Sequence, residues 1–261
     1  MHHKPKKRLG QNFLIDKNIQ RKLIASFALK ASDQILEIGA GYGDITRLVA
    51  QNVAFVYALE IDPVLCKILR DNLKEYKNIR IINKDILKFN LSRYFSRLKN
   101  KIKVVGNIPY YITTPIIEHL LKYQDRIETI FITVQKEFAR RITALSGSKE
   151  YGSFSCFVQY YTLPKSLFLI KKNSFLPTPK VDSCLLELKI RQAPLVKVRN
   201  EKSFFKIIRA AFNQRRKTLR NSLEGIVSLQ KLSLFFKNYG IDPDIRPEDL
   251  TIEDFAHLVN L

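Results

Sequence analysis

The heptapeptide Glu37-Ile38-Gly39-Ala40-Gly41-Tyr42-Gly43 decides the fold of this 261-residue chain. It closes a short apolar run at residues 34–38 and precedes an amphipathic stretch at residues 44–52. A strand, a glycine-rich loop and a helix in this order begin a βαβ unit. Glycine allows a sharp turn and a close approach of the backbone to a ligand. We therefore expect a ligand site where the first core strand ends.

Short apolar runs alternate with longer helical patterns through the middle of the chain. The predicted strands cover residues 34–38, 55–61, 79–83, 103–106 and 129–134, and the helices include residues 44–52 and 64–76. This alternation predicts an α/β fold with a parallel, doubly wound sheet. Thr114-Pro115 has the pattern of an N-cap followed by proline at the first helical position. Two further runs, 163–170 and 183–190, predict an antiparallel hairpin at the sheet edge.

The pattern becomes purely helical after about residue 192. Helices are predicted at residues 203–223, 229–239 and 252–260. We therefore expect a ligand-binding domain at residues 1–192, which begins with a basic segment at residues 1–15. A small, all-helical domain should follow at residues 193–261.

A formal net charge of +21 predicts a polyanionic partner. Nucleic acid is the first candidate and an anionic membrane surface is the alternative. The sequence contains no run of about 18 apolar residues, so we expect no membrane-spanning helix. No apolar region follows the basic N-terminus, so we expect no signal peptide. The three cysteines are scattered without metal-ligand spacing. They indicate a reducing, cytoplasmic environment and no metal site.

Polar residues and glycine mark the ends of four successive predicted strands. These residues are Gly39, Glu60, Asp85 and Asn107. Ligands of open α/β sheets bind at the carboxyl ends of the strands, so these four should share one site. Glu60 could accept both hydroxyls of a ribose, and Asp85 could accept from an adenine amino group.

The spacing of the glycines separates two kinds of nucleotide site. The dinucleotide pattern G-x-G-x-x-G requires a glycine at Asp44 or Thr46 and finds none. The pattern E-x-G-x-G-x-G instead resembles the first motif of class I S-adenosylmethionine-dependent methyltransferases. That resemblance implies a Rossmann-like sheet, S-adenosyl-L-methionine as cofactor and S-adenosyl-L-homocysteine as product.

The tetrapeptide Asn107-Ile108-Pro109-Tyr110 resembles the N-[LI]-P-Y motif of amino-methyltransferases. An adenine N6 amine is a poor nucleophile because its lone pair is delocalised into the ring. Hydrogen bonds from the amine to Asn107 Oδ1 and the Ile108 carbonyl would favour a more tetrahedral nitrogen. Tyr110 offers a ring on which an extruded base can stack. No metal and no strong general base is needed, because the proton can leave after methyl transfer.

Several longer strings extend the resemblance over nearly the whole chain. They are Arg8-Leu9-Gly10-Gln11-Asn12-Phe13-Leu14, Gln135-Lys136-Glu137, Tyr151-Gly152, Gln159-Tyr160-Tyr161, Phe175-x-Pro177-x-Pro179-Lys180-Val181-Asp182-Ser183 and Phe212-Asn213-Gln214-Arg215-Arg216-Lys217-Thr218-Leu219-Arg220-Asn221-Ser222-Leu223. With both motifs above, they resemble the KsgA/RsmA-type rRNA adenine N6,N6-dimethyltransferases.

This resemblance implies dimethylation of two adjacent adenosines near the 3′ end of small-subunit (16S) rRNA during ribosome biogenesis. The partner would be a pre-30S particle, and the enzyme a cytoplasmic monomer. The implied cofactor-binding residues are Asn12, Leu14, Gly39, Gly41, Glu60, Asp85 and Asn107. The implied catalytic residues are Asn107 and Tyr110, with Phe175 stacking on the other face of the target base.

The predicted helix at residues 203–223 supports an RNA-binding role. Arg209, Arg216 and Arg220 are spaced to share one helical face, and arginine suits phosphate. The candidate RNA-binding residues are Arg209, Arg215, Arg216, Lys217 and Arg220.

Three other functions stay open. An Erm-type enzyme that dimethylates one adenine of 23S rRNA and confers macrolide resistance is the main alternative, and Ile108 does not separate the two. A non-catalytic RNA-binding or assembly factor would retain the fold without needing Asn107, Tyr110 and Glu60. A DNA adenine methyltransferase is disfavoured because no separate sequence-reading domain is evident.

Overall fold

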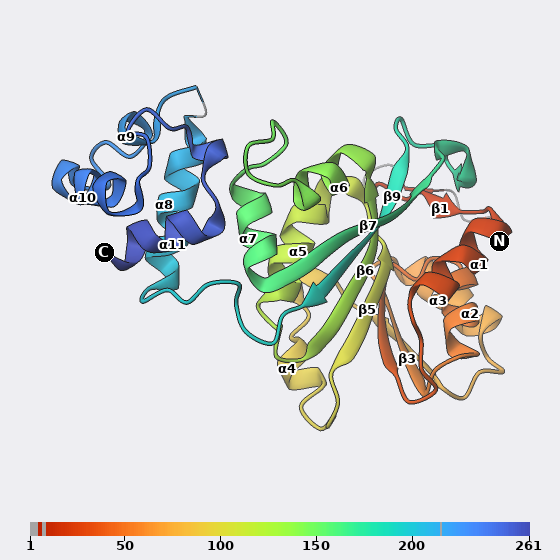
Figure 1. Ribbon diagram of the computed structural model, residues 1–261. Helices are drawn as coiled ribbons and strands as arrows, with labels where there is room; N and C mark the ends of the chain where they lie inside the picture. Colours follow the sequence, from red (N-terminus) through yellow and green to blue (C-terminus); the bar gives the residue numbers. More distant parts are fainter. Residues whose placement is uncertain (1–4, 7–8, 215) are drawn as a thin grey trace. The chain divides into compact units, whose positions relative to one another are not determined.

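The computed structural model describes residues 5–6, 9–214 and 216–261 of the chain (Figure 1). The strands are β1 Phe13–Leu14, β2 Gln34–Ile38, β3 Phe55–Glu60, β4 Ile79–Asn83, β5 Ile102–Asn107, β6 Ile127–Gln135, β7 Thr162–Ile170, β8 Phe175–Leu176 and β9 Ser183–Ile190. The helices are α1 Lys17–Ser26, α2 Asp44–Ala50, α3 Pro63–Asn72, α4 Leu91–Tyr94, α5 Thr113–Leu121, α6 Lys136–Thr143, α7 Ser153–Tyr161, α8 Glu201–Asn213, α9 Leu219–Ser222, α10 Leu229–Tyr239 and α11 Ile252–Asn260. Short 3₁₀ turns include η2 Ile86–Lys88 and η3 Tyr110–Ile112.

The main sheet has the order β4-β3-β2-β5-β6-β9-β7 within the described residues. Strands β2 to β6 are parallel to their neighbours, whereas β9 runs antiparallel to β6. From β2 the successive strands β3 and β4 are added on one side, whereas β5 and β6 are added on the other side. The order of the strands therefore reverses between β2 and β5, and open α/β sheets bind ligands at such a switch point. The parallel sheet and the hairpin of β7 and β9 are therefore confirmed.

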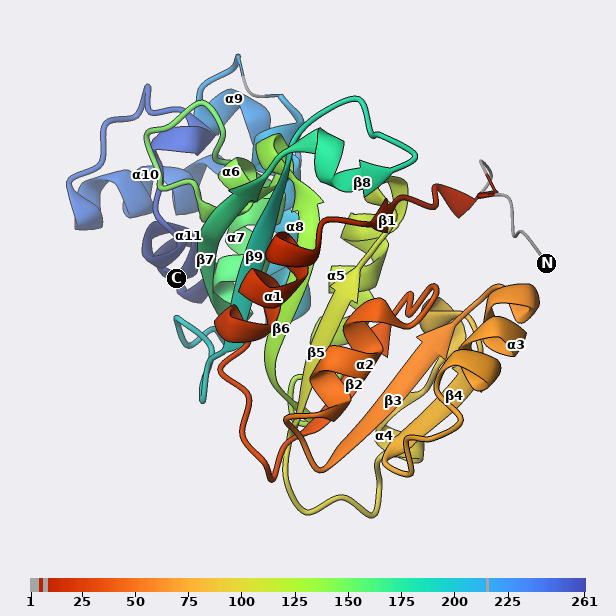
Figure 2. The same ribbon diagram turned by 90° about the vertical axis from the view of Figure 1, so that its right-hand side faces the viewer.

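Helices cover both faces of the sheet (Figures 1 and 2). On one face, apolar side chains of α1 and α2, such as Leu23 and Val49, join a buried cluster with Ile35 and Val105 of the strands. Helix α5 lies against the opposite face. Because successive strand residues point to opposite faces and both faces are covered, β2 and β5 are buried over most of their length.

Local sequence determines where helices α2 and α3 begin. Asp62 caps α3 by accepting from the Val64 backbone N–H, and Pro63 occupies the first helical position. Gly43 begins α2 with a φ of 88°, and a Cβ there would meet Leu69 and Leu73 at 3.0 Å. Glycine at this position therefore allows α3 to pack closely behind the loop.

Two predicted helices differ from the structure. Helix α5 begins at Thr113 after Ile112, so Thr114 is a helical residue and not the N-cap. The predicted helix at residues 203–223 is two helices, α8 and α9, with Thr218 capping the second. Thr218 accepts from the Asn221 N–H, which makes it a start signal inside an otherwise helical pattern.

The chain divides into two compact units. The first runs to Ala139 and includes Lys165–Ile190, and the second comprises Arg140–Pro164 and Arg191–Leu261. Helix α7 and the purely helical C-terminal part thus belong to the same unit. The assignment of catalysis to residues 1–192 and of recognition to residues 193–261 stays a prediction. No helix of the described residues is long and apolar enough to cross a membrane.

Candidate active site

A cavity lies at the carboxyl ends of β2, β3 and β5. Seven predicted site residues line it: Asn12, Gly39, Gly41, Glu60, Asp85, Asn107 and Tyr110. The apolar part of its wall comes from Ile38, Leu59, Leu65, Ile86, Ile108, Ile112 and Ile116. The strand ends that are about one βα unit apart in the sequence therefore meet in one site.

The carboxylate of Glu60 is held by the backbone of the two loops beside it. Its Oε2 accepts from the Gly41 N–H at 3.0 Å and its Oε1 accepts from the Asp62 N–H at 2.9 Å. Burial raises the pKa of Glu60, and these two hydrogen bonds oppose that rise. Each carboxylate oxygen can accept a second hydrogen bond. Glu60 can thus receive two ribose hydroxyls while the loops stay in place.

Asn107 is oriented by the segment that precedes β1. Its Nδ2 donates to the Asn12 carbonyl at 2.7 Å, across 95 residues of sequence. Since the amide nitrogen is engaged there, the Oδ1 atom is the acceptor that the side chain offers to a ligand. Asn107 therefore links the segment that precedes β1 to the tetrapeptide.

Asp85 has two roles in the structure. It lines the cavity, and its Oδ1 accepts from the Leu87 N–H at 2.9 Å, which caps η2. The cap orients the side chain, and the carboxylate retains acceptor sites for an exocyclic amine.

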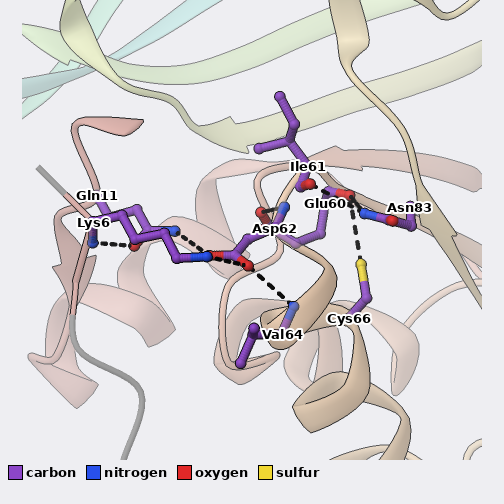
Figure 3. A network of polar contacts seen from close by, with 8 residues as sticks. All are labelled: Lys6, Gln11, Glu60, Ile61, Asp62, Val64, Cys66 and Asn83. Atoms are coloured by element: carbon purple, nitrogen blue, oxygen red, sulfur yellow. Dashed lines mark hydrogen bonds and ion pairs between the residues drawn. The ribbon is translucent and has the colours of Figure 1, made fainter. Parts of the chain in front are cut away.

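A polar network fastens the N-terminal segment beside the cavity (Figure 3). Lys6 Nζ lies 2.8 Å from both carboxylate oxygens of Asp62, whose side chain is fully buried. Gln11 accepts from the Lys6 N–H at 2.7 Å and donates to Asp62 at 3.5 Å. We call Lys6, Gln11 and Asp62 the N-terminal latch, because they hold in place the N-terminal segment that contains Asn12. Sequence reasoning missed it, although Asp62-Pro63 was readable as a helix start.

Gly10 lets the same segment pack on the tetrapeptide. It has a φ of 57°, and a Cβ there would meet Tyr111 Cε1 at 3.0 Å and Pro109 Cβ at 3.2 Å. The segment from Leu9 to Asn12 thus forms one wall of the cavity against Pro109 and Tyr111.

A second, smaller cavity lies on the other side of the glycine-rich loop. It shares Phe13, Gly39, Gly41 and Asn107 with the first. Glu37 also lines it, is 3% exposed, and its Oε2 has no hydrogen-bond partner among the described residues. Burial is the main cause that raises the pKa of Glu37 to about 8. Burial therefore favours the neutral form of the Glu37 carboxyl.

Two of the predicted cofactor-binding and catalytic residues do not line the first cavity. Leu14 is 6% exposed, lines the second cavity, and its carbonyl accepts from Gln20 Nε2 at 2.7 Å. Phe175 is 1% exposed and belongs to the core cluster, where β8 pairs with β1 in the register Leu14↔Phe175. Its ring is thus packed in the core and not displayed to a base.

Four predicted RNA-binding residues, Arg209, Arg216, Lys217 and Arg220, are exposed but do not share one helical face. Arg209 lies on α8 and Arg220 on α9, while Arg216 and Lys217 lie in the turn between them. The predicted common face is wrong because the helix breaks after Asn213. Arg215 lies outside the described residues.

The donor set of the first cavity fits S-adenosylmethionine. A buried carboxylate, a second acid at the neighbouring strand end, apolar walls and a glycine loop with positive φ at Gly39 and Gly41 suit a nucleoside with an attached amino acid. Among the described residues, no three His, Cys, Asp or Glu side chains gather as metal ligands.

Comparisons with known proteins give consistent similarities. The family model described as "Ribosomal RNA adenine dimethylase" matches residues 2–261. A protein named "Ribosomal RNA small subunit methyltransferase A" from Clostridium botulinum (strain Okra / Type B1) is 42% identical over 253 residues, which cover 97% of this chain and 92% of the relative. Its namesake from Streptococcus sanguinis (strain SK36) is 41% identical over 263 residues, with 98% and 91% covered.

Solved structures share the architecture over nearly the full length. A dimethyladenosine transferase from Plasmodium falciparum has a TM-score of 0.81 at 23% identity and covers 94% of this chain and 95% of its own. The 23S rRNA methyltransferase ErmE has a TM-score of 0.75 at 26% identity, with 95% and 98% covered. The predicted methyltransferase fold is therefore confirmed.

Proposed function

Because the chain belongs to the ribosomal RNA adenine dimethylase family, we propose that it dimethylates two adjacent adenosines near the 3′ end of 16S rRNA. The methyl donor is S-adenosyl-L-methionine, the product is S-adenosyl-L-homocysteine, and no metal takes part. The substrate is a pre-30S particle, on which the protein acts as a monomer in the cytoplasm.

The orientation of Asn107 carries the proposal. Its Nδ2 is bound to the Asn12 carbonyl, so its Oδ1 is left to accept a hydrogen bond from an exocyclic amine. The backbone carbonyl of Ile108 follows directly, at the position where the tetrapeptide leaves β5. Two acceptors side by side draw the amine out of conjugation with the ring and aim its lone pair. A non-catalytic RNA-binding protein would have no need of this arrangement.

Positioning accounts for most of the remaining chemistry. The bound cofactor supplies an activated methyl group on a sulfonium, so no metal or strong base is required of the protein. Glu60 and Asp85 hold the nucleoside end, and the glycine-rich loop with Asn12 and Leu14 holds the rest. Fixing both reactants in a near-attack geometry can contribute about 7–11 kcal/mol.

The target base is held by stacking, and the basic residues of the second unit bind the rRNA backbone. Tyr110 provides one ring, worth about 1–3 kcal/mol for a stacked base. Phe175 provides the second, and its burial in the core means that its side chain must move outward when RNA binds. Arg209, Arg215, Arg216, Lys217 and Arg220 contact phosphates of the rRNA. Residues 193–261 form the recognition domain, which follows the catalytic domain at residues 1–192 in the sequence.

The test is labelled-methyl transfer to undermethylated 30S particles and to protein-free 23S rRNA, with the products mapped. We expect two adjacent dimethyladenosines in the small-subunit RNA. One modified adenosine in 23S rRNA would instead assign the Erm-type activity, to which the similarity with ErmE points. Transfer to neither RNA would refute the proposal.

Asn107→Ala tests the mechanism in the same assay. We expect transfer to fall below about 1% of wild type, since two acceptors act together on the amine, while the cofactor Kd rises only a few-fold. Asn100→Ala makes the same chemical change in an exposed loop and should leave activity unchanged. Near-normal transfer by Asn107→Ala would rule out the role of its Oδ1 atom.

A further inference from the structure

The phenol of Tyr110 is bound to a residue outside the cavity. Its Oη lies 2.5 Å from Ser183 Oγ, across 73 residues of sequence. Tyr110 lines the cavity with its ring half-buried, whereas Ser183 is fully buried and is not part of the lining. Burial raises the pKa of the Tyr110 phenol, and the hydrogen bond with Ser183 opposes that rise.

Ser183 is held firmly from both sides. It begins β9 and is paired with Gln135 of β6 in the antiparallel ladder. The preceding residue, Asp182, accepts from the Lys136 N–H through its carbonyl at 3.1 Å and from the Lys172 N–H through Oδ1 at 3.0 Å. The backbone that carries the Ser183 hydroxyl is therefore fixed in the sheet.

The backbone of Tyr110 is fixed at its other end. Pro109 precedes it with φ −61°, and Tyr110 begins the turn η3. A tyrosine side chain has only two rotatable bonds that place its ring. With the backbone fixed, the contact at the phenol oxygen sets the first of these torsions. Because a phenol O–H bond prefers to lie in the plane of its ring, a hydrogen-bond partner at a fixed position also favours one setting of the second torsion, and with it one plane of the ring. Without the Ser183 contact, the ring would keep its backbone attachment but lose its distal anchor.

We propose that Ser183 is a positioning residue for methyl transfer, which holds the Tyr110 ring in the plane on which the target base stacks. This inference rests on the proposed function and assigns a role to a residue that touches neither cofactor nor RNA. Because the phenol is engaged by Ser183, Tyr110 acts through its ring face and not as an acid or base. The same strand end also places the stacking ring at a set distance from the Asn107 amide, since both belong to one tetrapeptide.

A double-mutant cycle of Ser183→Ala and Tyr110→Phe tests the proposal. Each single variant removes one half of the same hydrogen bond, so each should lower kcat/KM for RNA methylation about five- to twentyfold. The double variant should lose no more than the single ones, because Ser183 acts only through the phenol. The Kd for S-adenosylhomocysteine should stay within about twofold of wild type in all three. If the fold loss of kcat/KM in the double variant equalled the product of the two single losses, Ser183 would not act through Tyr110 and the proposal would be overturned.

Two controls separate this result from loss of folding and from failure of the proposed function. Ser166→Ala makes the same change in the β7–β9 hairpin, where Ser166 Oγ contacts Cys184 Sγ at 2.8 Å and not Tyr110. It should leave kcat/KM unchanged. Thermal unfolding of the four proteins of the cycle needs no RNA, and non-additive shifts there would establish the contact by itself. If wild type failed to methylate RNA while the Tm shifts of the cycle were non-additive, the proposed function would be refuted but the Ser183–Tyr110 contact would be supported. Additive Tm shifts would show that the two side chains do not interact.

Discussion

Glu37→Gln should change how the stability of the protein depends on pH. In the free protein the Glu37 carboxyl is buried, its Oε2 has no hydrogen-bond partner in the described part of the chain, and burial raises its pKa from 4.5 to about 8. A carboxyl whose pKa is raised by folding stabilises the fold below its unfolded pKa. That contribution is lost as the pH rises from about 4.5 towards 8, because the folded state then holds a proton that the unfolded state has released.

The size of the effect follows from the two pKa values. Each tenfold change in an acid dissociation constant corresponds to about 1.4 kcal/mol. Between pH 5 and pH 7.5, ionisation of Glu37 should therefore lower the free energy of unfolding of wild type by about 3 kcal/mol. Glu37→Gln has no carboxyl at this position and should not show this decrease. The glutamine amide has about the shape of the protonated carboxyl but carries two N–H donors in place of one O–H, and leaving the extra donor unsatisfied costs about 1–3 kcal/mol at every pH. The variant should be less stable than wild type at pH 5 and as stable or more stable at pH 7.5.

Urea and thermal unfolding of the cofactor-free protein at several pH values would measure this difference. For a chain of this size, about 3 kcal/mol corresponds to a relative change in Tm of about 6–12 °C. Glu118→Gln on α5 makes the same change at an exposed position and serves as the matched control. If wild type and Glu37→Gln gave parallel profiles from pH 5 to pH 8, Glu37 would be ionised in the fold and the reasoning would be refuted.

Two further predictions concern the cofactor and the RNA. Lys6→Ala removes the cation of the N-terminal latch and should raise the Kd for S-adenosylhomocysteine about three- to tenfold, measured by calorimetry, because Asn12 is then less well anchored. Lys74→Ala on the exposed surface is its control, and equal Kd values for the two variants would exclude the latch. Binding of small-subunit rRNA should weaken steeply with salt, and Arg220→Ala should reduce the log–log slope by about one. A slope near zero would show that phosphate contacts do not drive binding.

Much of the sheet was predictable because its signals are local. The strands β2, β4 and β9 have the predicted bounds, and β3, β5, β6 and β7 differ from their predicted bounds by one or two residues at either end. The two-residue strands β1 and β8 were not predicted. The hairpin was also predictable from its two runs and the proline-rich link, although β9 lies inside the sheet and β7 at its edge. Polar residues at successive strand ends indicated the site, because parallel strands bring their carboxyl ends to one edge.

The helical C-terminal part was harder to predict. Residues 203–223 have a continuous helical pattern, and the break between α8 and α9 depends on Thr218, whose side chain competes for a backbone N–H. The face assigned to Arg209, Arg216 and Arg220 was wrong for that reason. Helical periodicity alone does not reveal such an internal cap.

The sequence by itself determined the class of the fold, the glycine-rich loop and the identity of the residues at the strand ends, since these follow from periodicity and short-range backbone preferences. Tertiary structure decided which side chains orient one another: Asn107 with Asn12, Tyr110 with Ser183, and Lys6 with Asp62. It also placed Phe175 in the core beside β1. These contacts join residues far apart in the chain, and their geometry exists only after the strands have packed. No local pattern encodes which partner a buried amide or hydroxyl will find.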